Sequence, residues 1–521
     1  MSNQSRNLLA KLWTEYSRNS SVNALRYPFD SQLPKVERWW WRSSILSFIA
    51  AYCLIIVAIY FKWMLSPVVI TYTRTMHPIW SVPFPAVTIC PMAKVRVEEL
   101  NLSDVMIRAE NGAQFEGDEY EKLYALSHVC PFLQFWFQPR KAMNKSLVQI
   151  LNNISLPMED LFVNCYWKGT HKEIPCNKLL SRTMTDSGLC FTFNEISADH
   201  LLRMENVHPD SIPINSWTKS SDWSMETGYS RNAEVDNYPY RSIGKGFPSG
   251  FAVVLKTRKI DREYMCEGPV KGFQISIHPP DEYSTMTNRF YRLPFQQALF
   301  LTVKPVLTLI SRDLKKHSHS RRQCYFNDER FLRFFKVYNL NNCMLECMAN
   351  LTVSDCHCDK LSNPRSPNTT LCEGMNRFCS EIAQHKLMNP HGTINGNEEE
   401  IGPCYCMPSC VSLRYDVEVS RSPFNPHQFV DANHYTRNLY KHSDDHALVA
   451  VGFKSKWLLP LKRRELMGLS DLMAQIGGLF ALMMGASVIS LLEIAYFCIV
   501  RPLVRLFGYP RQVQPVQPWV E

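Results

Sequence analysis

The sequence predicts an α+β, disulfide-rich extracellular domain carried on two transmembrane α-helices. Two uncharged runs of 17 residues, Ile45–Phe61 and Ile476–Leu492, lie near the two ends of the 521-residue chain. Sixteen of the 18 cysteines lie between these runs. The long segment between them contains both strand-like alternation and helical spacing of apolar residues, which is typical of an α+β domain.

The first uncharged run predicts a transmembrane helix over residues 43–65. Seventeen residues are slightly short of a full span, but Lys62 can snorkel and Trp63–Leu65 extend the apolar stretch. The preceding Trp39–Trp41 argues against the alternative of a buried core helix, because indole rings favour the bilayer interface. The run follows too long a polar leader for an ordinary signal peptide.

The second run predicts a second transmembrane helix over residues 471–500, so both ends of the chain lie on one side. Residues 1–42 hold seven Lys/Arg against three acidic residues, and residues 501–521 hold three Arg against one Glu. Both tails are therefore expected in the cytoplasm, with residues 66–470 outside the cell and the protein in contact with plasma-membrane lipid. The net charge of +9 shows no pattern that suggests nucleic-acid binding.

The cysteines between the spans indicate an oxidising compartment. An even number in one large loop suggests disulfides. Cys356-His-Cys358 and Cys404-Tyr-Cys406 have a spacing that zinc can use in a reducing compartment, but a disulfide ladder is favoured outside the cell, so no metal site is predicted. The same loop carries five Asn-x-Ser/Thr sites for N-glycosylation, namely Asn101, Asn144, Asn153, Asn350 and Asn368.

Several short elements are expected within residues 66–470. Alternating apolar residues predict strands over 86–89, 251–255 and 273–277 and a shorter one over 161–163, while helical spacing predicts helices over 331–338 and 342–348.

The sequence contains no motif that indicates an enzyme. Gly-x-Ser-x-Gly, a Walker loop and His-Glu-x-x-His are all missing from it. The histidine-containing stretches HSHSRR (317–322) and HSDDH (442–446) are interpreted as exposed loops and not as metal sites. We therefore predict neither catalysis nor a cofactor.

The second predicted span carries a stripe of small residues. Ala474, Gly478, Ala481 and Gly485 recur at steps of four, three and four, which places them on one side of a helix. Such a stripe lets membrane helices approach closely or leaves room for a lumen. Simple helix packing is the alternative interpretation.

Polar groups in the same span favour a pore. Gly485-Ala486-Ser487 supplies an unhindered backbone, and Ser487 and Ser490 supply hydroxyls. Oxygen ligands in a narrow ring can replace the water shell of a small cation. Glu493 is costly against lipid, so it is expected to face protein or water.

The chain resembles the degenerin/epithelial sodium channel (DEG/ENaC) family, and within it the insect pickpocket branch. The resemblance runs from about Ser20 to Phe497. The residues that carry it are FPAVTIC (84–90), CMLECMANLTVSDCHC (343–358), CYCMPSC (404–410) followed by Tyr415, and IGGLFALMMGASVISLLEIAYF (476–497).

This resemblance implies a trimeric channel with a hand-like ectodomain, built as a homotrimer or a heterotrimer. The channel would be sodium-selective, amiloride-sensitive and voltage-independent. Gly485, Ala486 and Ser487 match the family's selectivity tract, and Ala474 matches the position where a bulky residue holds the pore open. Glu493 matches the carboxylate near the inner end of the second helix.

The resemblance also implies a disulfide pattern. It pairs Cys90–Cys190, Cys165–Cys176, Cys324–Cys410, Cys343–Cys406, Cys347–Cys404, Cys356–Cys379 and Cys358–Cys372, which leaves Cys130 and Cys266 as the eighth pair. These bridges are expected to stiffen the region that conveys ectodomain movement to the helices.

Two departures from the family pattern matter. Asn23-Ala24 stands where the family has a His-Gly motif that supports opening, so this subunit is expected to open poorly alone. The residues associated with proton gating have no clear match. The stimulus, whether mechanical, chemical or osmotic, is left open.

Other classes of protein fit the sequence less well. A non-conducting or modulatory subunit or receptor is the main alternative. An ectoenzyme would need a catalytic constellation, and an ATP-gated purinergic channel shares the topology but has different motifs.

Overall fold

The computed structural model describes residues 16, 27–29, 33–65, 68–136, 146–168, 174–214, 221, 223–230, 237–286, 289–373, 375–388, 404–427, 440, 443–485, 487–501 and 503. The chain divides into two compact units. One unit comprises residues 1–69 and 465–521, and the other comprises residues 70–464.

The first unit is helical. Its elements are η2 (Tyr27–Phe29), α2 (Lys35–Leu65), α14 (Leu469–Met484), α15 (Val488–Ala495) and the π-helix η8 (Tyr496–Val500). Leu, Ile, Val, Ala and Phe dominate α2, and none of its side chains is buried. An apolar helix without a buried side chain is the pattern expected of a lipid-facing segment.

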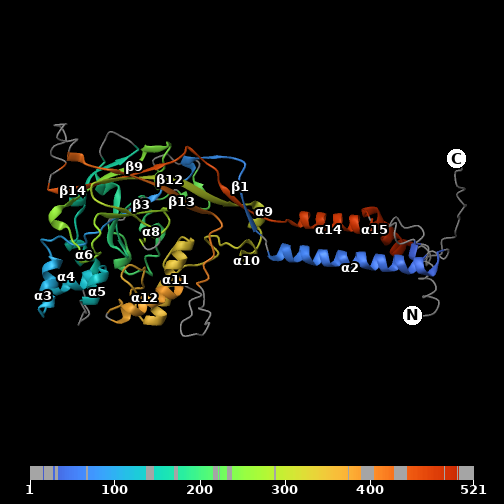
Figure 1. Ribbon diagram of the computed structural model, residues 1–521, viewed down its shortest axis with the longest axis horizontal. Helices are drawn as coiled ribbons and strands as arrows, with labels where there is room; N and C mark the ends of the chain where they lie inside the picture. The colour runs from blue at the N-terminus through green and yellow to red at the C-terminus, as the bar shows by residue number, and fades with distance from the viewer. Residues whose placement is uncertain are drawn as a thin grey trace. The chain divides into compact units, whose positions relative to one another are not determined.

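The second unit contains two main sheets in its described part (Figure 1). The larger sheet has the order β1 (Val68–Tyr72), β16 (Leu461–Glu465), β12 (Gln297–Ile310), β14 (Asp444–Phe453), β9 (Gly246–Arg258), β4 (Phe162–Trp167), with β13 (Ser412–Pro423) also paired to β12. The smaller sheet has the order β11 (Tyr291–Leu293), β10 (Phe273–His278), β3 (Ala86–Pro91), β6 (Gly188–Phe193), β5 (Leu180–Thr185). Two ribbons pair β15 (Trp457–Leu458) with β2 (His77–Pro78), and β7 (Trp223–Ser224) with β8 (Gly228–Tyr229).

The main hydrophobic core takes side chains from both sheets. Phe193 of β6 stacks on Phe251 of β9 with ring centroids 4.2 Å apart. Phe84, just before β3, meets Trp167 and Phe453 of the larger sheet edge-on at 4.9 and 5.1 Å. Aromatic pairs of this kind contribute about 0.5–1.5 kcal/mol each beyond the area they bury. The core therefore fixes one sheet against the other.

Helices lie around the sheets. Figure 1 shows α3 to α6 gathered at one end of this unit and α11 and α12 side by side. The helices and helical turns are α3 (Leu102–Glu110), α4 (Gly117–Ser127), α5 (Pro131–Trp136), α6 (Leu147–Ile154), α7 (Met158–Leu161), α8 (Ala198–Leu201), α9 (Arg312–Lys315), α10 (His319–Arg322), α11 (Leu340–Cys356), α12 (Met375–Met388), η3 (Ile79–Ser81), η4 (Cys176–Lys178), η5 (Pro209–Ser211) and η6 (Lys259–Asp261).

Within the described ranges, sixteen cysteines form eight disulfides, all in the second unit. They join the same pairs that the resemblance implies: Cys90–Cys190, Cys130–Cys266, Cys165–Cys176, Cys324–Cys410, Cys343–Cys406, Cys347–Cys404, Cys356–Cys379 and Cys358–Cys372. Three of these pairs anchor α11 to the segment 404–406 or to α12. The remaining cysteines, Cys53 and Cys498, are exposed thiols in the first unit.

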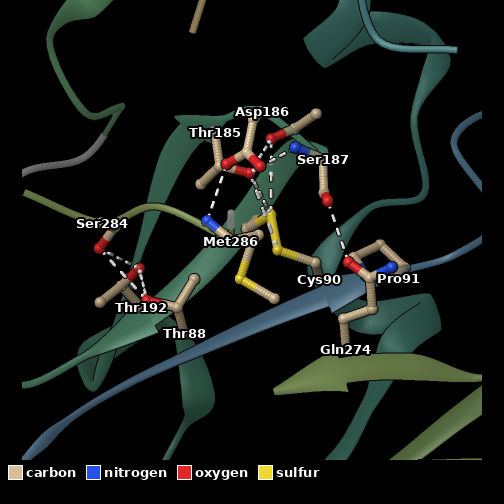
Figure 2. The surroundings of a disulfide bond; sticks show 12 residues. Thr88, Cys90, Pro91, Thr185, Asp186, Ser187, Thr192, Gln274, Ser284 and Met286 are labelled. Carbon is tan, nitrogen blue, oxygen red and sulfur yellow. Dashed lines mark hydrogen bonds between the residues drawn. A yellow bond between two sulfur atoms is a disulfide. The ribbon is translucent and has the colours of Figure 1, made fainter. Parts of the chain in front are cut away.

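Figure 2 shows how one disulfide joins neighbouring strands. Cys90 of β3 and Cys190 of β6 follow the register in which Thr88 pairs with Thr192. The hydroxyls of these two threonines and of Ser284 lie within 3.4 Å of one another (Figure 2). The strand that carries the FPAVTIC motif is thus fixed by a covalent bond and a buried polar cluster.

Most of the expected elements occur, but some predictions are wrong. The strands expected at 86–89, 251–255 and 273–277 lie in β3, β9 and β10, and the helix expected at 342–348 lies in α11. Only part of the 161–163 run is strand, since Leu161 ends α7 and β4 begins at Phe162.

Residues 331–338 do not form the expected helix. The backbone N–H groups of Arg333 and Phe334 donate to the Glu346 carboxylate, each at 2.8 Å, and Phe335 bridges to Leu202. These bonds to distant partners replace the ones that a local helix would make. The segment packs its apolar side chains into a second core cluster instead.

The two histidine-containing stretches are not simple exposed loops. Asp444–His446 begin β14 and are buried, and His319–Arg322 form the short helix α10. Arg322 is buried because it pairs with Glu329 and stacks over Phe326.

Candidate functional site

The helix that follows the second unit in the sequence stops at Gly485. This residue has φ +62° and ψ +22°, a left-handed conformation, and its N–H donates to the Ala481 carbonyl at 2.9 Å. Glycine adopts this conformation without steric cost, which makes it the usual residue for ending a helix. The segment 471–500, predicted as one span with an irregular backbone at 485–487, is therefore divided into α14, which ends at Met484, and α15, which begins at Val488.

The next helix starts with two serines that cap each other. The Ser490 N–H donates to the Ser487 hydroxyl at 3.4 Å, and the Ser487 N–H donates to the Ser490 hydroxyl at 3.1 Å. This reciprocal pattern satisfies two N–H groups that lack a partner inside the helix. Where water is excluded, such internal partners are what make an interrupted helix tolerable.

One side of α14 packs against α2 within the first unit. The Phe480 ring lies 5.7 Å from that of Tyr52, and the Trp63 indole N–H donates to the Met467 carbonyl at 3.1 Å. The residues of α14 that are buried or half-buried follow a helical spacing and are Leu472, Ile476, Leu479, Phe480 and Met483.

The small residues occupy the other side of α14. Ala474, Gly478 and Ala481 are exposed. At 100° per residue, their side of the helix is roughly 180° from the side that packs on α2. A Cβ added to Gly478 would meet no heavy atom within 4 Å among the described residues. The stripe is thus left uncovered by the part of the chain that the structure describes.

Polar side chains continue along α15. Ser490 is buried and Glu493 is half-buried, and because they are three residues apart they lie on the same side of the helix. The Glu493 carbonyl accepts the N–H of Tyr496, where the π-helix η8 begins. The Arg501 guanidinium then lies over the Phe497 ring at 5.0 Å. A carboxylate and a basic residue therefore lie near this end of the segment.

Only one helix in the described residues is long and apolar enough to cross a membrane by itself, and that helix is α2. The other candidate, residues 469–483, is shorter because of the interruption at Gly485.

Some predicted residues lie outside the described part of the chain. These are Ala486, the Asn23-Ala24 pair and the glycosylation candidate Asn144. The other glycosylation candidates are exposed, and they are Asn101, Asn153, Asn350 and Asn368. The Asn101 side chain also accepts the Asp104 N–H at the start of α3.

Sequence reasoning missed the mutual capping of Ser487 and Ser490. The two hydroxyls were expected only as polar groups of the pore. The Ser-x-x-Ser spacing resembles a capping box, and read together with Gly485 it is a signal for a helix start.

A buried carboxyl lies in the interior of the second unit. Burial raises the pKa of Glu195 to about 7, although hydrogen bonds from Ser284 and Thr183 act in the opposite direction. This group is part of the polar cluster behind β3 and β6, not of the helical segment.

The family model of the amiloride-sensitive sodium channel matches residues 16–497. The chain belongs to the amiloride-sensitive sodium channel family. Its members are membrane-embedded ion channels and not enzymes. The match covers both helical segments and the disulfide-rich extracellular domain.

Known proteins similar to this chain agree with that assignment. Pickpocket protein 28 of Drosophila melanogaster is 24% identical over 94% of this chain and 78% of its own length. Sodium channel protein Nach of the same species is 22% identical over 94% of this chain and 87% of its own length. Acid-sensing ion channel 4 of Rattus norvegicus is 24% identical over 79% of this chain and 65% of its own length.

Proposed function

We propose that this protein is a subunit of a sodium-selective, amiloride-sensitive and voltage-independent channel of the plasma membrane. The observation that carries the proposal is the interrupted helix at Gly485–Ser487 together with the uncovered stripe of small residues on α14. The channel would have a sensory role, and the sequence leaves open whether its stimulus is mechanical, chemical or osmotic.

The proposed topology has two spans, one formed by α2 and one by α14 with α15. The excess of Lys and Arg in residues 1–42 and 501–521 supports cytoplasmic tails at both ends. The interruption between α14 and α15 is compatible with a span because an irregular backbone is accepted at membrane depth where it lines water or protein.

The small-residue stripe supports assembly around a central pore. Since Ala474, Gly478 and Ala481 face away from α2, that side is free to meet other subunits or a lumen. In a homotrimer or heterotrimer, three copies of this side would surround the ion path. A bulky side chain at Ala474 would then force the helices apart.

The Gly485–Ser487 tract would act as the selectivity filter. The backbones of Gly485 and Ser487 lie outside the regular helices, so carbonyl and hydroxyl oxygens of the tract can replace part of the water shell of sodium. Ions would then leave past Ser490 and Glu493. The membrane potential drives this inward movement by about 2.3 kcal/mol per charge per 100 mV.

The decisive experiment is voltage-clamp recording of an Ala474→Phe variant expressed alone. A steady, sodium-selective current blocked by amiloride is expected, because the phenyl ring bypasses the unknown stimulus. Met473→Phe is the matched control, since Met473 is the exposed neighbour on another side of α14. Equal currents from the two variants would argue against a gating role for Ala474.

A non-conducting or modulatory subunit is the second candidate function. It is favoured by Asn23-Ala24, which replaces the family's His-Gly motif. It predicts no current from Ala474→Phe alone despite confirmed surface expression, and an altered current when the chain is co-expressed with a conducting family member.

A further inference from the structure

An imidazole is buried at the start of β14. His446 is 2% exposed and lies opposite Lys256 in the pairing of β14 with β9. Among the described residues, neither Nδ1 nor Nε2 of its ring has a hydrogen-bond partner. A buried polar group left unsatisfied costs about 1–3 kcal/mol, so such a group calls for an explanation.

A second imidazole lies beside the first. The ring centroids of His427 and His446 are 5.3 Å apart and the rings are inclined at 78°. Both rings line a small cavity of about 80 Å³. Two imidazoles bound to one tetrahedral zinc ion, with Zn–N of about 2.0 Å, have centroids roughly 5 Å apart. The observed centroid spacing of 5.3 Å is compatible with that arrangement.

The backbone holds the two rings at this spacing. Gln296, which has a left-handed φ of +59°, donates its N–H to the His446 carbonyl at 2.7 Å. Its own carbonyl accepts the Phe424 N–H at 2.8 Å. Phe424 lies three residues before His427, just after β13 ends. The start of β12 therefore joins the two histidine-bearing segments and preorganises the site.

The charges around the cavity are mixed. Asp444 and Asp445 line it and are both buried. Asp445 is paired with Arg262, whereas the Asp444 carboxylate accepts a hydrogen bond from the Ser443 hydroxyl at 2.9 Å. Lys259 also lines the cavity and contributes a positive charge. The two carboxylates make the surroundings compatible with a divalent cation.

We propose that His427 and His446 bind a divalent transition-metal ion, with Zn²⁺ the best match. Imidazole nitrogen is a preferred ligand of Zn²⁺ and Cu²⁺, whereas Ca²⁺ and Mg²⁺ prefer oxygen. The described residues contain no group of three or more His, Cys, Asp or Glu side chains placed to hold a metal. Water molecules therefore complete the coordination of the ion. With only two protein ligands, the ion would bind reversibly, as a regulatory site requires.

The position of the site suggests what the metal does. His427 follows β13 and His446 opens β14, so the ion joins the two ends of the connection 428–443 to the larger sheet. Both strands flank β12, which also pairs with β16 just before α14 in the sequence. Binding would restrain the sheet that leads into the second span.

The test uses the full-length protein in detergent, titrated with zinc chloride while the melting temperature is followed. Wild type is expected to show a saturable rise, and His427→Ala and His446→Asn to lose it. Loss of an outer-shell partner alone typically costs about 10- to 100-fold in metal affinity, so loss of a ligand should cost at least as much. The matched control is His319→Ala, an exposed histidine on α10.

X-ray absorption at the zinc edge supplies a second readout, in which two imidazole ligands per ion are expected. An equal shift for wild type, His427→Ala and His319→Ala would mean an adventitious ion only and would overturn the proposal. If His446→Asn does not fold, His427→Ala alone decides, because His427 is not fully buried. None of these readouts depends on ion conduction.

Discussion

Replacing Ser490 by alanine should weaken the sodium selectivity of the channel. The hydroxyl of Ser490 accepts the Ser487 N–H at 3.1 Å, and the Ser487 hydroxyl accepts the Ser490 N–H at 3.4 Å. Alanine keeps its backbone N–H, so the Ser487 hydroxyl still caps the helix. The Ser487 N–H loses its partner, and leaving it unpaired away from water costs about 1–3 kcal/mol. The change therefore disfavours the observed geometry of the tract by roughly 2 kcal/mol, a factor of about 30 in population.

The assay is the reversal potential measured with sodium on one side and potassium on the other. The Ala474→Phe background keeps the channel open without its stimulus. Each tenfold change in the permeability ratio moves this potential by about 59 mV for a univalent ion. A fivefold loss of selectivity, well within the estimated effect, would shift it by about 40 mV.

Two variants serve as controls for this prediction. Ser490→Thr keeps the hydroxyl and should retain selectivity, and Ile489→Ala changes an exposed neighbour that takes no part in the cap. A reversal potential that Ser490→Ala leaves unchanged would refute the idea that the cap sets the filter. Unchanged selectivity and conductance in Ser487→Ala would count against the filter assignment itself.

Three further predictions concern the extracellular domain. Cys343→Ser removes the bond to Cys406 and should cost about 2–5 kcal/mol, lowering surface expression or altering gating; normal surface labelling with normal currents would contradict this. Because the pKa of Glu195 is about 7 when folded, above its ordinary 4.5, its carboxyl binds more protons folded than unfolded between these values. Stability should thus fall as pH rises through this window. Glu195→Gln should recover up to about 3 kcal/mol of stability at pH 8, with no gain at pH 4. A difference in melting temperature between variant and wild type that is the same at both pH values would exclude this explanation. Tyr415→Phe loses the hydrogen bond to the Pro83 carbonyl at 2.8 Å and should lower stability by about 1 kcal/mol in denaturant unfolding, and an unchanged midpoint would show that the bond contributes nothing.

The parts of the fold that could be predicted depend on local patterns. Strand alternation located residues 86–89, 251–255 and 273–277, because each strand presents an apolar side to the shared core. The segment 331–338 could not be predicted, since its conformation depends on the Glu346 carboxylate in a different element. Burial of Asp444–His446 likewise depends on pairing with β9, which is remote in sequence.

The candidate pore segment was predictable in part for the same reason. Helical periodicity alone places Ala474, Gly478 and Ala481 on one side, and the glycine at 485 marks the interruption. The spacing does not by itself reveal that the Ser487 and Ser490 hydroxyls accept each other's backbone N–H. The pairing of His427 with His446 was also out of reach, because it follows from the register of three strands.

The two-sided character of α14 has a consequence for how subunits meet. The uncovered stripe of small residues consists of glycine and alanine, which carry no polar side-chain atoms and are tolerated by lipid. Under the proposed topology, a single subunit can persist in the bilayer after synthesis, held together by its own α2. Association with other subunits is then a separate, later event. Different gene products that carry the same stripe of small residues can compete for places in one channel. The composition of the finished channel would depend on which subunits a cell makes and in what proportion.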